Sequence, residues 1–150
     1  MALKMLSLVL TFYSINCFAQ GEEAGVKSTI NRFFEGMRKS DSTLIKSTLA
    51  PAALLQSVAQ EKDGTIRVRT EQFQEFITAV TKPHPEVYDE RITYDVIKID
   101  STLAIAWTPY KFYVGATFSH CGTNSFQLVK LNGDWKIQYI IDTRRKEACP

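Results

Sequence analysis

Apolar residues between positions 26 and 37 recur with the period of an α-helix. They fall three or four residues apart, which places them on one face of a helix predicted over residues 22–39. The stripe consists of Val26, Ile30, Phe33, Phe34 and Met37. Ser40-Asp41-Ser42 then offers capping side chains for a second helix over residues 43–49. Pro51 should end that helix, because proline cannot continue it.

A hairpin and a third helix are predicted next. Asp63-Gly64 separates two strand-like segments, residues 53–60 and 65–69, and glycine supplies the positive φ that a tight turn requires. Thr70 is expected to cap a helix over residues 71–81. The apolar face of this helix consists of Phe73, Phe76, Ile77 and Val80.

The apolar period changes to 2 after Pro85, which indicates strands. The predicted strands cover residues 87–99, 103–114, 123–131 and 134–143, with a turn or bulge over 115–122 and a tight turn at Asn132-Gly133. Alternation should place Leu103, Ile105 and Trp107 on one face and Ala104, Ala106 and Thr108 on the other. In the last strand it should separate Trp135, Ile137, Tyr139 and Ile141 from Lys136, Gln138, Ile140 and Asp142.

The order of these elements, helices first and then an antiparallel meander, predicts an α+β fold. The expected architecture is a curved antiparallel sheet with the N-terminal helices on its concave face. Residues 20–150 should form a single domain of this kind.

The first 19 residues have the three-part layout of a secretory signal peptide. Lys4 precedes an apolar stretch over residues 5–13, and Cys17-Phe18-Ala19 places small side chains at the recognition positions if cleavage follows Ala19. The apolar stretch is too short to span a membrane, which takes about 20 residues. The sequence therefore predicts an exported protein, periplasmic or secreted. A buried N-terminal helix or strand and a lipid anchor on Cys17 are the alternatives.

Cleavage would leave 131 of the 150 residues, which suits one domain. They carry 17 Lys and Arg, because only Lys4 is lost from 18, against 16 Asp and Glu. Nucleic-acid binding relies on clustered cations that neutralise phosphates, so this balance argues against a nucleic-acid partner. No second apolar segment is long enough for a membrane span.

Cleavage would also leave two cysteines of three, Cys121 and Cys149. An even number in an exported protein favours a disulfide, which here would tie the C-terminal tail to a strand. Two free thiols are the alternative. A zinc site is less favoured, because only His84 and His120 could join the cysteines and there is no Cys-x-x-Cys pair.

Three stretches of the sheet region carry a resemblance to a known superfamily. They are Trp107-Thr-Pro-Tyr110-Lys-Phe112, then His120-Cys121-Gly122 with Ser125-Phe126-Gln127-Leu128, and Trp135-Lys136-Ile137 followed by Asp142-Thr143-Arg144-Arg145. With the order of elements, they make residues 22–147 similar to the nuclear transport factor 2-like (SnoaL-like, cystatin-like) cone-fold superfamily. The likeness is closer to its bacterial putative lumazine-binding group. The resemblance implies a cone, a pocket at its open end and frequent dimerisation through the outer sheet face, so a homodimer is expected.

His120 and Asp142 are the candidate catalytic residues. A histidine at the start of a strand can act as a general base, and an acid near the end of the last strand could pair with it, each shifting the pKa of the other. The alternatives are a His120 bonded to backbone at a strand bulge and an Asp142 ion-paired with Arg144 or Arg145. Steroid isomerase chemistry is not supported, because the first helix lacks the tyrosine that such enzymes use as oxyanion donor.

A pocket inside the cone would have aromatic and apolar walls, although core packing explains such clusters more often than ligand binding does. The predicted lining consists of Phe34, Met37, Trp107, Tyr110, Phe112, Asn124, Phe126 and Tyr139. The first hypothesis is a non-catalytic module that binds an unknown small organic molecule and needs no cofactor or metal. The alternative is a cyclase- or isomerase-type enzyme in which His120 and Asp142 transfer protons.

Overall fold

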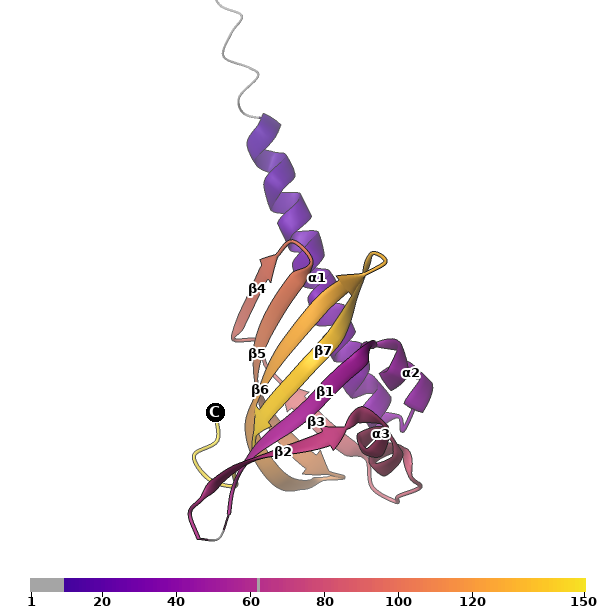
Figure 1. Cartoon of the computed structure of the whole chain (residues 1–150), viewed down its shortest axis with the longest axis vertical. Helices are drawn as coiled ribbons and strands as arrows, with labels where there is room; N and C mark the ends of the chain where they lie inside the picture. Colours follow the sequence, from indigo (N-terminus) through magenta and orange to yellow (C-terminus); the bar gives the residue numbers. More distant parts are fainter. Residues whose placement is uncertain (1–9, 62) are drawn as a thin grey trace, which may run out of the picture.

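The computed structural model describes residues 10–61 and 63–150 (Figure 1). The start of the predicted export signal, residues 1–9, lies outside the described residues. Among the described residues, no helix is long and apolar enough to cross a membrane. The elements are α1 (Leu10–Arg38), α2 (Ser42–Ser47), β1 (Leu49–Gln60), β2 (Ile66–Gln72), α3 (Phe73–Thr81), β3 (Tyr88–Ile92), β4 (Val96–Asp100), β5 (Leu103–Val114), β6 (Thr117–Leu131) and β7 (Asp134–Thr143).

The first two helices form where the apolar period indicates them. α1 covers the predicted segment and begins earlier, at Leu10, so its first turns project beyond the end of the sheet (Figure 1). α2 follows Asp41, whose side chain accepts a hydrogen bond of 2.9 Å from the N–H of Leu44. Asp41 is therefore the cap that the sequence offers between the two helices.

Pro51 lies inside β1 and does not end α2, which stops at Ser47. The prediction for Pro51 was wrong because a strand starts at Leu49. A proline is tolerated at this point, since the pairing of β1 with β7 is irregular between Leu49 and Leu54.

The β1–β2 hairpin and α3 follow in the predicted order. α3 begins at Phe73, two residues later than expected, because β2 continues through Gln72. Thr70 therefore does not cap the helix. It lies in β2, where its hydroxyl accepts a hydrogen bond of 2.9 Å from Gln56 Nε2. Pairing along the hairpin outweighs the local preference of threonine for a cap.

The strands form one curved sheet in the order β2-β1-β7-β6-β5-β3, with β4 also paired to β5. Neighbouring strands are antiparallel except for β1 and β7, which run parallel. The last strand thus lies beside the first, and β6 and β7 form the centre of the sheet. α1 runs along one face of this sheet (Figure 1).

Pro109 explains why the single strand predicted over residues 87–99 is divided into two strands. Residues 87–99 form β3 and β4, and both pair with β5. Three residues between them, 93–95, stand opposite only two residues of β5, 108 and 109. Pro109 has no N–H to donate, while its carbonyl accepts a hydrogen bond of 2.9 Å from the N–H of Thr93. The pairing therefore bulges at the proline.

The side chains of β5 alternate between the two faces of the sheet as predicted. The inward set of Ala104, Ala106 and Thr108 is buried. The outward set of Leu103, Ile105 and Trp107 is exposed by 49, 44 and 47%. One face of the sheet thus belongs to the core, and the other presents apolar side chains to solvent.

A β-bulge in β7 overturns the predicted alternation of its second half. Gln138 is an extra residue between Ile137 and Tyr139 in the pairing with β6. Trp135 and Ile137, before the bulge, are buried, but beyond it the buried residues are Ile140 and Asp142, which alternation assigns to the other set. The predicted faces were wrong after Gln138, because one inserted residue sends every later side chain to the opposite face.

The core lies between the helices and the concave face of the sheet. The predicted apolar stripe of α1 is between 0 and 4% exposed. The ring of Phe34 on α1 meets that of Phe126 on β6 edge to face, with centroids 6.0 Å apart. Each such buried ring contributes about 2–3 kcal/mol to folding. The α+β fold with helices on the concave face is therefore confirmed.

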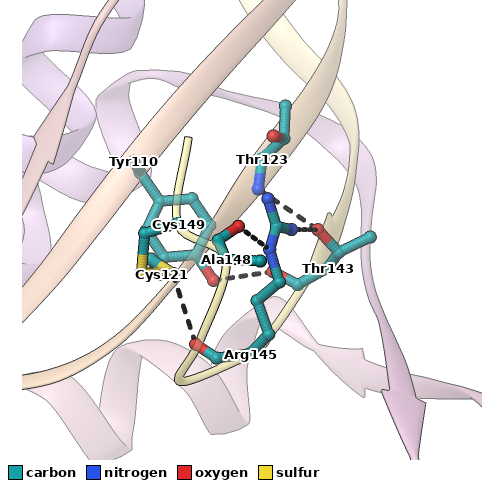
Figure 2. The surroundings of a disulfide bond; sticks show 7 residues. All are labelled: Tyr110, Cys121, Thr123, Thr143, Arg145, Ala148 and Cys149. Atoms are coloured by element: carbon teal, nitrogen blue, oxygen red, sulfur yellow. Dashed lines mark hydrogen bonds between the residues drawn. A yellow bond between two sulfur atoms is a disulfide. The ribbon is translucent and has the colours of Figure 1, made fainter.

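The predicted disulfide between Cys121 and Cys149 is formed (Figure 2). Beside it, Cys121 and Arg145 exchange backbone hydrogen bonds of 2.8 and 2.9 Å. The guanidinium of Arg145 donates from Nε to the carbonyl of Ala148 at 2.9 Å. The C-terminal tail is thus held against β6 both covalently and by backbone pairing.

Candidate functional site

A small cavity lies between the concave face of the sheet and the helices. Its volume is about 40 Å³. The apolar part of the lining is Phe33, Phe34, Met37, Leu55, Phe76, Phe126 and Ile140. The polar part is Glu90, Asn124, Asp142 and Arg144. A space of this size holds a few water molecules, because one water needs about 10–15 Å³.

Glu90 and Asn124 make a direct contact in this cavity. Asn124 Nδ2 donates to Glu90 Oε1 at 2.7 Å. Burial raises the pKa of the Glu90 carboxyl to about 7; the bond from Asn124 opposes this rise, and the charge of Asp142 adds to it. Glu90 therefore changes its protonation state near neutral pH.

Asp142 is the second acid of the cavity. The bulge at Gln138 turns its side chain inward, where it is 6% exposed. Oδ2 accepts from Arg144 Nε at 2.9 Å and lies 3.3 Å from the Tyr110 hydroxyl. Oδ1 is buried and accepts no hydrogen bond from any described residue. An unpartnered buried acceptor costs about 1–3 kcal/mol, so Oδ1 is the atom of this lining residue that lacks a donor.

Tyr110 supports Asp142 from β5. Its hydroxyl donates to the carbonyl of Thr143 at 2.9 Å (Figure 2). The same hydroxyl lies 3.3 Å from Asp142 Oδ2. Its ring crosses Gly122, where a Cβ would stand 2.8 Å from the ring and 1.7 Å from the Thr143 oxygen. Burial and the nearby charge of Asp142 raise the pKa of Tyr110, which keeps the hydroxyl protonated as a donor.

His120 is not one of the residues that line the cavity. A register shift next to Phe112 places His120 at a strand bulge, as one of the sequence alternatives expected, but its contact there is with a side chain and not with the backbone. Its Nδ1 lies 3.1 Å from Ser119 Oγ, and its ring centroid lies 4.9 Å from that of Phe112. Burial and the charge of Arg144 lower the pKa of His120. The hydrogen bonds of Asp142 go to Arg144 and Tyr110, so the expected pairing of His120 with Asp142 is absent from this arrangement.

The strand limits of β6 also differ from the prediction. Residues 117–122, expected as a turn, belong to β6, which begins at Thr117. The turn is confined to Gly115, whose φ is 60°, and Ala116. His120 therefore sits within a strand and not at the start of one.

The structure brings together only part of the predicted site. Of the predicted residues, those that line the cavity are Phe34, Met37, Asn124, Phe126 and Asp142. Tyr110 touches it through Asp142, and Phe112 stands opposite Glu90 in the β3–β5 pairing. Trp107 and Tyr139 project from the outer face, where the Tyr139 hydroxyl donates to Gln56 Oε1 at 2.5 Å.

Glu90 and Arg144 are the polar lining residues that the sequence-based site lacks. Glu90 had a sequence signal, because it alternates with Tyr88 and Ile92 on the apolar side of a predicted strand. Arg144 was expected only as an ion-pair partner of Asp142, and that pair is present. Within residues 10–61 and 63–150, no three His, Cys, Asp or Glu side chains lie close enough to hold a metal ion.

The fold of the chain is shared with solved structures of low sequence identity. A conserved protein from Planctomyces limnophilus has a TM-score of 0.67, 15% identity, and coverage of 84% of this chain and 98% of its own. A nuclear transport factor 2-like protein of unknown function from Shewanella baltica has a TM-score of 0.64, 18% identity, and coverage of 85 and 96%. A cystatin-like domain of unknown function from Nostoc punctiforme has a TM-score of 0.63, 11% identity, and coverage of 85 and 80%. The chain therefore has the same cone fold as these nuclear transport factor 2-like and cystatin-like proteins.

The amino-acid sequence identifies the family of the chain. Residues 21–139 match the family described as "Putative lumazine-binding", and the chain belongs to that family. The resemblance seen in the sequence is thus confirmed. No curated protein matches the chain significantly.

Proposed function

We propose that the chain, after loss of residues 1–19, is an exported domain that binds a small organic molecule inside the cone without transforming it. The observation that carries the proposal is the cavity, in which apolar walls meet a group of polar side chains that includes an unpartnered carboxylate oxygen. Ligand sites combine apolar walls with a few directed polar groups in this way. The family description supports a ligand-binding role.

The cavity must widen to admit a ligand of more than a few atoms. Small-molecule sites usually measure about 300–1,000 Å³, well above the volume of this one. Phe76 on α3 is the partly buried ring of the lining, whereas the rings of Phe33, Phe34 and Phe126 are almost fully buried. Phe76 also stacks on Phe33, with centroids 5.7 Å apart. We expect Phe76 to turn aside when the ligand enters.

Export is supported by two independent features. The family match begins at residue 21, two residues after the predicted cleavage at Ala19. The disulfide joins Cys121 and Cys149, the two cysteines that would remain after cleavage. Disulfides persist in oxidising compartments, which supports a periplasmic or secreted location.

The outer face of the sheet supports a homodimer. Val96, Leu103, Ile105 and Trp107 form an outer-face patch, with exposures between 41 and 49%. Val96 pairs directly with Trp107 across β4 and β5, so the patch is continuous. Contiguous exposed apolar side chains mark association sites more often than free surface. The near balance of charges gives no support for a nucleic-acid partner.

The proposal is tested by recovering the ligand. The protein is expressed with its own N-terminal segment, purified from the exported fraction and extracted with methanol for mass spectrometry. We expect a compound in the extract of the wild type that is missing from Ile140→Phe, in which an added ring fills the cavity. Trp107→Ala, on the outer face, is the control and should keep it. If folded Ile140→Phe retained the compound, the cone would not be its site. Lumazine itself serves as a direct probe, because its own fluorescence reports binding.

The alternative of a proton-transfer enzyme predicts a different outcome. His120 and Asp142 would have to act together, whereas Asp142 is bound to Arg144 and Tyr110. We expect His120→Ala to leave ligand affinity unchanged and the recovered ligand to remain unaltered after incubation with protein. Turnover that disappears in His120→Ala would establish the enzyme instead.

A further inference from the structure

The polar side of the cavity carries more negative than positive charge. Glu90, Asp142 and Arg144 are the ionisable side chains of its lining. Arg144 is already engaged, because its Nε donates to Asp142 Oδ2 at 2.9 Å, and its side chain is 47% exposed. With Glu90 ionised, the three groups sum to one negative charge. A monovalent cation would neutralise this negative charge, and Arg144 can stay paired with Asp142 while it does so.

The unpartnered oxygen of Asp142 favours a ligand that can donate a hydrogen bond. Asp142 lines the cavity, is more than nine-tenths buried and leaves Oδ1 without a partner. The Asn124 amide, the neutral polar group of the lining, donates to Glu90. No described side chain, Arg144 and Glu90 included, donates to Oδ1, so a molecule that enters the cavity can supply this donor.

The apolar walls favour a cationic donor over an anion. Four of the lining residues are phenylalanines, namely Phe33, Phe34, Phe76 and Phe126. The faces of aromatic rings attract cations, with about 0.5–2 kcal/mol per contact depending on desolvation. An anion would meet two carboxyls and four electron-rich rings, so the lining disfavours it.

Resting on the proposed function, we propose that the cavity receives a cationic N–H group of the ligand, an ammonium or amidinium. One N–H donates to Asp142 Oδ1, the charge lies beside Glu90, and the phenylalanine rings enclose the carbon atoms next to the nitrogen. The volume of about 40 Å³ suits such a head group, with the rest of the ligand extending past Phe76.

Binding of a cation should depend on pH through Glu90. The charged and titratable groups that face Glu90 are Asp142 and Arg144 at the end of β7 and Tyr110 on β5. α1, α3 and β1 contribute apolar side chains to the lining, and β6 contributes Asn124. Because burial raises the pKa of Glu90 to about 7, the cation should bind better as pH rises through 7 and Glu90 ionises.

Acetamidinium and acetamide form a matched pair of probes for this proposal. They have the same shape and both carry N–H groups, but only acetamidinium is charged. Each is titrated into the full exported chain at pH 8 and constant ionic strength, and the side-chain amide of Asn124 is followed by NMR. We expect saturable shifts with acetamidinium in the millimolar range, since about four non-hydrogen atoms cannot supply high affinity. Acetamide should bind about tenfold more weakly, because it lacks the charge that is attracted to the carboxyls of Glu90 and Asp142.

Glu90→Gln is the informative variant, because glutamine keeps an acceptor for Asn124 and removes the charge. We expect it to weaken acetamidinium about tenfold at pH 8 and to leave acetamide unchanged. Lowering the pH from 8 to 6 should weaken acetamidinium about fivefold in the wild type and have little effect in Glu90→Gln. Glu75→Gln, on the exposed face of α3, is the control and should bind as the wild type does.

Three outcomes would overturn the proposal. Equal affinity for both probes would show a ligand site that does not select charge, and the proposed function would survive. Shifts confined to the outer-face patch would show that the cation does not enter the cone. The absence of shifts at Asn124 with either probe would leave water as the partner of Asp142 Oδ1. In that case the methanol extract decides the proposed function independently.

Discussion

Asn124 on β6 donates a hydrogen bond of 2.7 Å to Glu90 on β3, across the intervening strand β5. The two residues are 34 positions apart in the chain. Curvature of the sheet tilts inward-facing side chains toward one another, so that two strands that are not neighbours can share a hydrogen bond. The bond fixes an acid of raised pKa at the cavity and ties the edge of the meander to its centre.

Glu90→Gln should change how stability depends on pH. The folded state holds a proton on Glu90 up to about pH 7, whereas the ordinary pKa is 4.5, so ionisation destabilises the fold as pH rises between these values. Stability from this group is fully present below about 4.5 and lost above about 7. Urea unfolding at pH 5 and pH 8 measures it. The difference in free energy of unfolding, variant minus wild type, should be about 1–3 kcal/mol more favourable to the variant at pH 8 than at pH 5. A parallel pH dependence in both proteins would show that folding does not raise the pKa of Glu90.

Tyr110→Phe should destabilise the protein through the loss of one hydroxyl. That hydroxyl donates to the Thr143 carbonyl at 2.9 Å and lies beside the buried Asp142. Its removal should lower the free energy of unfolding by about 1–2 kcal/mol, because a buried acceptor loses its donor. Tyr139→Phe is the matched control on the outer face and should cost less. Equal effects of the two substitutions would contradict the role of Tyr110 in holding Asp142.

Removal of the disulfide should destabilise the chain and free its tail. Cys121 and Cys149 are 28 residues apart, and closure of such a loop contributes about 3–4 kcal/mol in the chain-entropy model. The double variant Cys121→Ser, Cys149→Ser should show this loss in urea unfolding. Counting thiols in the unreduced, denatured wild type should find none. A count of two free thiols would show that the disulfide is not formed, and it would weaken the case for export.

Trp107→Lys should dissociate the homodimer without unfolding the protomer. The Trp107 side chain is 47% exposed in the protomer, so its replacement leaves the core intact. Sedimentation equilibrium should find a dimer for the wild type and a monomer for the variant. Val68→Lys, at an exposed site on β2, is the control and should remain dimeric. A monomeric wild type at micromolar concentration would refute the proposed dimer.

Much of the fold follows from local patterns in the sequence. β5 and β7 begin and end at the predicted residues, because clear turn residues stand on both sides of β5 and before β7 and their apolar positions alternate. The stripe of α1 is likewise buried as its period indicates. These features depend on side chains that are near one another along the chain, which is why a single sequence reveals them.

The site was harder to predict, because bulges decide which side chains reach it. Alternation correctly predicts that Tyr139 and Asp142 lie on opposite faces of the sheet. It assigns each of them to the wrong face, because the bulge at Gln138 exchanges the inner and outer faces for all later residues. Asp142 thereby reaches the cavity and Tyr139 leaves it. The bulge is set by the pairing with β6, a long-range relationship that the local sequence does not contain. The contact of Glu90 with Asn124 depends on the curvature of the whole sheet for the same reason.

Nuclear Overhauser effects between the recovered ligand and the protein test most directly whether the cone is the binding site. We predict contacts from ligand protons to the ring of Phe126 and the side-chain amide of Asn124, which lie on the inner face of β6. Contacts only to Trp107 and its neighbours in the outer-face patch would contradict a ligand site inside the cone.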